Sequence, residues 1–168
     1  MNKTIAVCPG SFDPITKGHL DIISRSSKMF DKVIVVVMSN VYKTSSTFTL
    51  EERKELIKKS VAGLKNVEVD CYDGLLADYA ASKKAGVIIK GLRAMSDFEY
   101  EFQMALANKK LNPELETVFL TTSAENMYLS SSMVKEIASM GGEIRDFVPA
   151  IIHDTIVRRI ESERKKDL

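Results

Sequence analysis

Five short apolar segments recur along the chain, and most of them are rich in valine and isoleucine. They lie at residues 5–8, 33–38, 67–72, 87–89 and 118–121. Most are near-continuous apolar runs rather than alternations of apolar and polar residues, which is typical of strands buried on both faces of a sheet. The pattern therefore predicts five buried strands.

The longer segments between these runs have the periodicity of helices. Thr49 and Glu52 match a capping box, with Thr49 as the N-cap of the helix that follows. Phe98, Phe102 and Leu106 are four residues apart, which predicts a stripe that faces the core. The expected helices cover residues 18–29, 50–63, 75–84, 97–110, 130–139 and a C-terminal segment from 151.

Strands that alternate with helices indicate βαβ units and a parallel sheet. We therefore expect an α/β fold: a single doubly wound, Rossmann-like domain over residues 1–168, with a five-stranded parallel sheet and a C-terminal helix. A chain of 168 residues is long enough to bury a core without metals or disulfides. The sequence shows no internal repeat and no linker.

Composition and charge restrict the class of partner. The formal net charge is +1, which argues against broad nucleic-acid binding. Cys8 and Cys71 have no CxxC spacing and are expected to be reduced, buried apolar residues. No signal peptide is visible, and the longest apolar run, 33–38, is too short to span a bilayer. We expect a cytoplasmic protein that binds neither nucleic acid nor membrane.

The stretch PGSFDPITKGH, residues 9–19, joins the first predicted strand to the first helix. In an open parallel sheet, ligands bind beyond the carboxyl ends of the strands and at helix N-termini. The dinucleotide motif GxGxxG and the P-loop GxxxxGK[ST] are both absent. Gly18 allows close approach of a ligand to the backbone, and His19 falls in the first helical turn, where phosphate is favoured.

The string Thr16-Lys17-Gly18-His19 resembles the [ST/H]xGH signature of a nucleotidyltransferase superfamily. Two further motifs follow later strands in order: KGLR at 90–93 with DFEYE at 97–101, and NMYLSSS at 126–132. Together the three motifs resemble the bacterial phosphopantetheine adenylyltransferase family over roughly residues 4–150.

This resemblance implies a reaction and the substrates that bind. The phosphate of 4′-phosphopantetheine would attack the α-phosphorus of ATP in line, giving dephospho-coenzyme A and pyrophosphate without a covalent enzyme intermediate. Mg²⁺ would accompany ATP and be held mainly by its phosphates and by water. The resemblance also implies a homohexamer and feedback inhibition by coenzyme A.

The resemblance assigns a role to each motif. His19 would stabilise the transition state at the α-phosphate. Contacts to ATP are implied for Ser11, Phe12, His19, Gly91, Leu92, Arg93, Glu101, Asn126, Met127, Tyr128, Leu129, Ser130, Ser131 and Ser132. Contacts to the acceptor are implied for Ser11, Lys43, Leu76 and Lys90.

Two positions depart from the family pattern. Lys90 stands where the family usually has arginine, so the charge is kept but the bidentate fork is lost. Asn126 stands where an aromatic residue is usual, with Tyr128 nearby, which leaves the contact at position 126 open.

Simpler structural roles compete with several of these assignments. His19 could have no role beyond capping or packing at the start of a helix, and Lys43 could be a solvated lysine. Asp97 and Glu101 share one helical face, which could be a solvated acidic surface. His153 has no motif around it and is expected to be structural.

Two other functions remain open on the sequence alone. The chain could be a related transferase that uses another acceptor, such as nicotinamide mononucleotide or glycerol 3-phosphate. Thr16 and the KGLR motif favour phosphopantetheine. The chain could instead be a non-catalytic nucleotide-binding regulator, although His19, which such a protein could most easily lose, is present.

Overall fold

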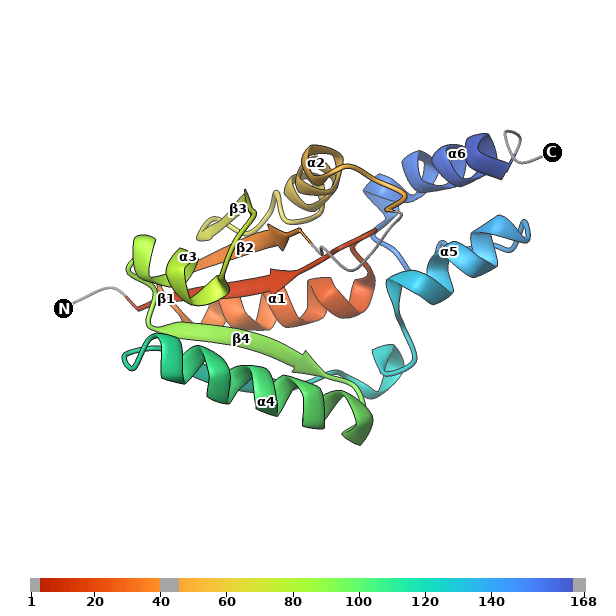
Figure 1. Ribbon diagram of the computed structural model, residues 1–168. Helices are drawn as coiled ribbons and strands as arrows, with labels where there is room; N and C mark the ends of the chain where they lie inside the picture. Colours follow the sequence, from red (N-terminus) through yellow and green to blue (C-terminus); the bar gives the residue numbers. More distant parts are fainter. Residues whose placement is uncertain (1–3, 40–45, 165–168) are drawn as a thin grey trace.

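The computed structural model describes residues 4–39 and 46–164 (Figure 1). Five strands form one sheet in the order β3-β2-β1-β4-β5, and every neighbouring pair is parallel. The strands are β1 (Ile5–Gly10), β2 (Lys32–Met38), β3 (Val67–Tyr72), β4 (Val87–Leu92) and β5 (Glu116–Thr121). The five predicted strands and the doubly wound α/β fold are confirmed.

Helices connect the strands and follow the last one. They are α1 (Lys17–Met29), α2 (Leu50–Ser60), α3 (Leu76–Ser82), α4 (Met95–Leu111), α5 (Ser131–Ser139) and α6 (His153–Arg164), with 3₁₀ turns η1 (Ala124–Asn126) and η2 (Ala150–Ile152). The predicted capping box at the start of α2 is present: Glu52 N–H donates to Thr49 Oγ1, and Thr49 N–H donates to the Glu52 carboxylate. Figure 1 shows α5 and α6 beyond the carboxyl ends of the strands.

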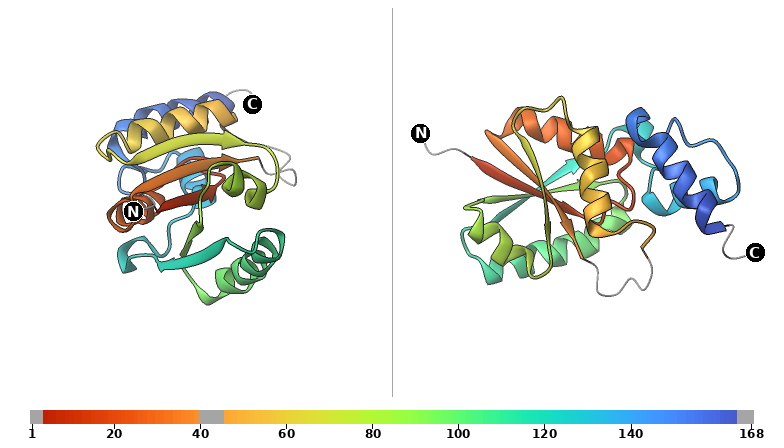
Figure 2. Two further views of the ribbon diagram at one scale, coloured as in Figure 1. Left: turned by 90° about the vertical axis from the view of Figure 1, so that its left-hand side faces the viewer. Right: turned by 90° about the horizontal axis from the view of Figure 1, so that it is seen from above.

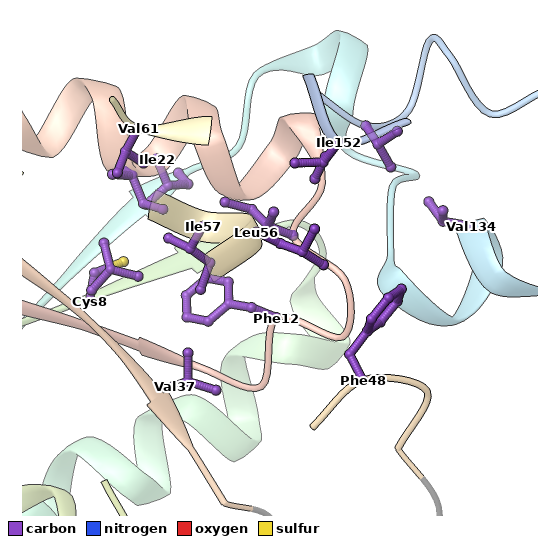
Figure 3. Packing of buried hydrophobic residues seen from close by; sticks show 14 of the residues in the cluster. Cys8, Phe12, Ile22, Val37, Phe48, Leu56, Ile57, Val61, Val134 and Ile152 are labelled. Atoms are coloured by element: carbon purple, nitrogen blue, oxygen red, sulfur yellow. The ribbon is translucent and has the colours of Figure 1, made fainter. Parts of the chain in front are cut away.

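Two hydrophobic clusters form the core, one on each face of the sheet. Figure 2 shows that helices lie on both sides of this sheet. Ala6 and Cys8 of β1 belong to the larger cluster, and Val7 between them belongs to the smaller one. The larger cluster continues past the end of the sheet to Val134 of α5 and Ile152 of η2 (Figure 3). The strand ends and the C-terminal helices are therefore packed together as one unit.

The strand order places a topological switch point between β1 and β4. From β1 the chain passes outward through β2 to β3, then returns to place β4 on the other side of β1. The loops that leave β1 and β4 therefore diverge and leave a crevice at the carboxyl ends of these two strands, where ligands bind in open α/β sheets.

The predicted core stripe on α4 is wrong. Phe102 is 45% exposed and Leu106 is 56% exposed, while Phe98 is half-buried and stacks on Phe102 with 5.5 Å between ring centroids. The helix packs against β4, β5 and α3 with part of its surface only, and no other described element of this chain covers the rest. A four-residue apolar spacing identifies a face to be covered but does not say which chain covers it.

None of the helices in the described ranges is long and apolar enough to cross a bilayer.

Candidate active site

A pocket with a cavity volume of about 350 Å³ lies at the switch point, at the carboxyl ends of β1 and β4. Its walls come from the loop after β1, the start of α1, the end of β4, α4 and the segment before α5. It brings together the predicted site residues Ser11, Phe12, His19, Lys90, Gly91, Arg93, Glu101, Asn126, Leu129, Ser130, Ser131 and Ser132. Three motifs far apart in sequence thus line one cavity.

Other predicted site residues lie elsewhere. Leu76 begins α3 and packs against the smaller hydrophobic cluster. Leu92 ends β4 without lining the pocket, and Met127 and Tyr128 are exposed beside it. Lys43 lies outside the described residues. Ligand contacts at these five positions stay predictions.

His19 occupies the third residue of α1, with Thr16 as the N-cap. The backbone N–H of Thr16 donates to His19 Nδ1 at 3.0 Å, and His19 N–H donates to Thr16 Oγ1 at 3.3 Å. His19 therefore completes a capping box with Thr16, in line with the simpler interpretation, and it also lines the pocket. Because Nδ1 accepts a hydrogen bond, the neutral imidazole carries its proton on Nε2, the nitrogen left for a ligand.

The imidazole of His19 is held in its neutral form. Burial, together with the positive charges of Arg93 and Lys90, lowers its pKa from 6.5 to about 4. At neutral pH, His19 therefore presents a neutral Nε2–H donor to the cavity rather than an imidazolium charge. An anion bound in the pocket would counteract the effect of the two cations.

Two ion pairs hold the cations of the pocket. Lys90 Nζ lies 3.1 Å from Glu101 Oε2. Arg93 Nε lies 3.1 Å from Asp97 Oδ2, and Arg93 Nη1 donates to the Leu129 carbonyl at 3.0 Å. Asp97 and Glu101 therefore face the pocket and its cations, which removes the alternative of a purely solvated acidic surface.

The loop after β1 has an unusual backbone conformation. Phe12 has φ +46°, the left-handed region that a bulky residue rarely adopts, and its ring is buried. The Phe12 ring and the His19 imidazole form a T-shaped pair, with centroids 5.1 Å apart. A Cβ at Gly10 would lie 2.9 Å from the Phe12 ring, so this close approach requires glycine.

The serine run at the start of α5 forms the opposite wall. Ser130 is the N-cap of α5 and accepts from Met133 N–H at 3.1 Å. Ser131 Oγ donates to the Pro14 carbonyl at 2.7 Å, which joins this wall to the loop after β1. Ser131 and Ser132 lie in the first turn of α5, where unpaired backbone N–H groups favour an anion.

Asn126, where the sequence left the contact open, ends the 3₁₀ turn η1 and lines the pocket. Its side-chain amide donates to Ser123 Oγ at 2.7 Å, and its Cβ and carbonyl oxygen lie against Gly18. Asn126 therefore orders the turn that faces the start of α1.

Sequence reasoning missed several residues that shape the site. Cys8 lines the pocket, but burial raises the pKa of its thiol to about 12, so it stays protonated. Buried Arg53 donates to the Ser11 carbonyl at 2.8 Å. Buried Asp13 pairs with Lys135 across 122 residues of sequence. No local spacing signals such long-range contacts; only the unusual residue content of the 9–19 loop marked the region.

His153 lies away from the pocket, in a polar cluster that joins α6 to the preceding loop. Its Nδ1 lies 2.8 Å from Asp154 Oδ1, and its Nε2 lies 2.8 Å from Glu143 Oε1. The hydrogen bond to Asp154, followed by that to Glu143, raises the pKa of His153 above 6.5, against the effect of burial. These contacts are consistent with the structural role expected for His153.

Replacing His153 with glutamine is expected to lower stability more at acid than at alkaline pH. The raised pKa means that the folded state binds the proton more tightly than the unfolded chain does, so the stabilisation is present below pH 6.5 and is lost as pH rises through the folded pKa. The check is the melting temperature of both proteins at about pH 5.5 and about pH 9. An equal difference at both values would contradict the assigned pairing.

Comparisons with known proteins show the family to which the chain belongs. The model of the cytidylyltransferase-like family matches residues 7–137. Phosphopantetheine adenylyltransferase of Alkaliphilus metalliredigens is 58% identical over 148 residues, covering 88% of this chain and 94% of the relative. The enzyme of that name from Clostridium botulinum strain Eklund 17B is 58% identical over 155 residues, covering 92% and 97%. That from Caldanaerobacter subterraneus is 54% identical over 157 residues, covering 94% and 98%.

A solved structure shares the fold. A nicotinate-nucleotide adenylyltransferase from Vibrio parahaemolyticus superposes with a TM-score of 0.67 at 18% identity, covering 92% of this chain and 99% of its own. The family match and the identities above, over nearly the full length of the relatives, show that the chain belongs to the phosphopantetheine adenylyltransferase family of cytidylyltransferase-like nucleotidyltransferases.

Proposed function

We propose that this pocket transfers the adenylyl group of ATP to 4′-phosphopantetheine by direct in-line displacement. A phosphate oxygen of the acceptor forms a bond to the α-phosphorus, the bond from that phosphorus to the α,β-bridging oxygen breaks, and pyrophosphate leaves with the electron pair. The products are dephospho-coenzyme A and pyrophosphate. Family membership makes the chain a nucleotidyltransferase of coenzyme A synthesis.

The observation that carries this proposal is the neutral, oriented imidazole of His19. Thr16 occupies Nδ1, so Nε2–H is the donor available to an α-phosphate oxygen. Charge builds on these oxygens in the transition state, and a donor fixed beforehand stabilises that charge without reorganising. The site needs no protein nucleophile for this step.

The remaining groups would position the phosphate of the acceptor and the phosphates of ATP. Lys90, at the end of β4, would bind the acceptor phosphate, and Arg93 would bind ATP on the other side of Gly91. Ser130, Ser131 and the first turn of α5 would receive the β- and γ-phosphates. Positioning and positive charge of this kind supply most of the catalysis in phosphoryl and nucleotidyl transfer.

Mg²⁺ fits this site as the counter-ion of ATP. In the described part of the chain no three His, Cys, Asp or Glu side chains gather in a way that could hold a metal. The two carboxylates of the pocket, Asp97 and Glu101, are each paired with a cation. We propose that phosphate oxygens and water hold the ion, which neutralises phosphate charge and so favours departure of pyrophosphate.

We propose further that the chain works as a cytoplasmic homohexamer inhibited by coenzyme A. Several apolar side chains of α4 are exposed, among them Tyr100, Phe102, Leu106 and Leu111, and they support self-association. Coenzyme A contains both a pantetheine arm and an adenine nucleotide, so it matches both halves of the site. Sedimentation would test the assembly, and product inhibition kinetics would test the regulation.

Lys90→Arg is expected to keep or improve acceptor binding. The guanidinium keeps the charge and the pairing with Glu101, and it adds a fork that matches phosphate. The measurement is the KM for 4′-phosphopantetheine, with Lys90→Met as the variant that loses the charge. A collapse of activity in Lys90→Arg would show that the pocket is shaped for lysine.

Isotope exchange tests direct transfer. Labelled pyrophosphate should enter ATP when dephospho-coenzyme A is present and should not do so in the absence of both acceptor and product. Exchange without either would show an adenylyl-enzyme and contradict direct displacement. No exchange under any condition, despite ATP binding, would assign the chain to the regulator class.

A further inference from the structure

Asp13 is a buried carboxylate in the loop between β1 and α1 that does not itself line the pocket. It accepts hydrogen bonds from the backbone N–H groups of Thr47, at 3.2 Å, and Phe48, at 3.0 Å. Lys135 Nζ of α5 lies 2.9 Å from its Oδ2. A buried carboxylate needs such compensation, so Asp13 is bound to two segments that are remote in sequence.

The residues on the N-terminal side of Asp13 are fixed as well. Arg53 Nη1 donates to the Ser11 carbonyl at 2.8 Å. Phe12, between these two anchored residues, has the left-handed backbone conformation. A strained residue of this kind persists only where its surroundings over-determine it, and here both of its neighbours are tied down.

Apolar contacts join the same three segments. Phe12 of the loop, Phe48 before α2 and Val134 of α5 all belong to the larger hydrophobic cluster, and all three are labelled in Figure 3. Val134 precedes Lys135, and α5 begins with the serines of the pocket wall. The pair of Asp13 with Lys135 therefore lies behind the pocket and connects two of its walls.

We propose that Asp13 is a positioning residue for adenylyl transfer. Through Lys135 and the N–H groups of Thr47 and Phe48, its carboxylate fixes the loop so that the Phe12 ring holds the His19 imidazole opposite the start of α5. The kinetic part of this inference rests on the proposed function.

Three variants test the proposal by kinetics: Asp13→Asn, Lys135→Met and the double variant. We expect kcat to fall by about 10- to 100-fold in Asp13→Asn, with a much smaller change in the KM for ATP, because misplacement of a catalytic group acts on the transition state. Lys135→Met should lower kcat less, since the two backbone donors remain. Adding Lys135→Met to Asp13→Asn should lower kcat little further, because the two residues act through the same pair.

Two controls separate positioning from loss of stability. Lys135→Arg should restore most of the activity lost in Lys135→Met. Asp70 forms an ion pair of the same length, with Lys83 Nζ at 2.9 Å, and accepts from Tyr79 Oη, but it is more exposed than Asp13 and lies outside the pocket. Asp70→Asn should lower the melting temperature and leave kcat of the folded protein unchanged.

The two histidines give a readout that does not depend on turnover. The chain contains only His19 and His153, so NMR titration follows both imidazoles in one sample. In Lys135→Met and Asp13→Asn the pKa of His19 should move up from about 4 towards 6.5, because a loosened loop admits water. The pKa of His153 should not move, since its contacts lie elsewhere.

Some results would overturn the proposal. One is a kcat within about twofold of wild type in both Lys135→Met and Asp13→Asn. Another is an unchanged pKa of His19 in these variants. A third is an equal shift in the pKa values of both histidines, which would indicate general loosening of the fold. If Asp13→Asn does not fold, Lys135→Met decides alone. If the wild type lacks adenylyltransferase activity, the proposed function fails, whereas the titration still tests whether Asp13 holds His19.

Discussion

His19→Ala is expected to lower kcat by about 10²- to 10³-fold, the usual effect of removing one preorganised donor to a developing oxyanion. The affinity for ATP should weaken much less, because Arg93 and the wall formed by the serines remain in place. Steady-state kinetics with both substrates, together with direct ATP binding, would separate the two effects. Near-full turnover of the variant would contradict the role assigned to His19.

Two further variants make this test specific for a neutral donor. Glutamine at position 19 offers an uncharged N–H, so His19→Gln should retain more activity than His19→Ala. His153→Gln is the matched control, because the other histidine of the chain belongs to a polar cluster away from the pocket. It should leave kcat unchanged under conditions in which the protein is folded.

Gly10→Ala is expected to impair both folding and turnover. The new Cβ would lie 2.9 Å from two atoms of the Phe12 ring, so the ring must move, and it is buried in the main cluster. Overpacking of this kind costs about 1–3 kcal/mol of stability. The same displacement would shift the Phe12 ring that contacts His19, so kcat should fall by about tenfold or more.

Gly63→Ala is the matched control for this substitution. A Cβ at Gly63 meets no atom within 4 Å, so both stability and turnover should stay near wild type. Adding Phe12→Leu to Gly10→Ala should recover part of the stability by relieving the contact, but not the lost kcat. Recovery of full turnover by the double variant would show that Phe12 does not orient His19.

The sequence predicted the strands and the helix cap because these features depend on residues that are close together in the chain. The five valine- and isoleucine-rich runs became strands, and Thr49 with Glu52 capped α2 as expected. The three motifs that follow strand ends met in one pocket, because the carboxyl ends of parallel strands share one edge of the sheet. The strands and the cap followed from local residue content, whereas the three motifs were identified by the family resemblance.

Long-range contacts were beyond the reach of such patterns. The hydrogen bonds of Asp13 link residues 34, 35 and 122 positions apart, and nothing in the spacing of these residues marks them. The stripe on α4 failed for a related reason: Phe102 and Leu106 have helical spacing, but no other described layer of the same chain covers them. Burial of an apolar face depends on its partner as well as on its period.

The most direct test of the central claim is pyrophosphate release from ATP and Mg²⁺ with a panel of acceptors. The panel contains 4′-phosphopantetheine, nicotinamide mononucleotide, glycerol 3-phosphate and a sample without acceptor. We expect release with 4′-phosphopantetheine alone. Release with a different acceptor would contradict the proposed reaction. So would the absence of release with every acceptor although ATP binds.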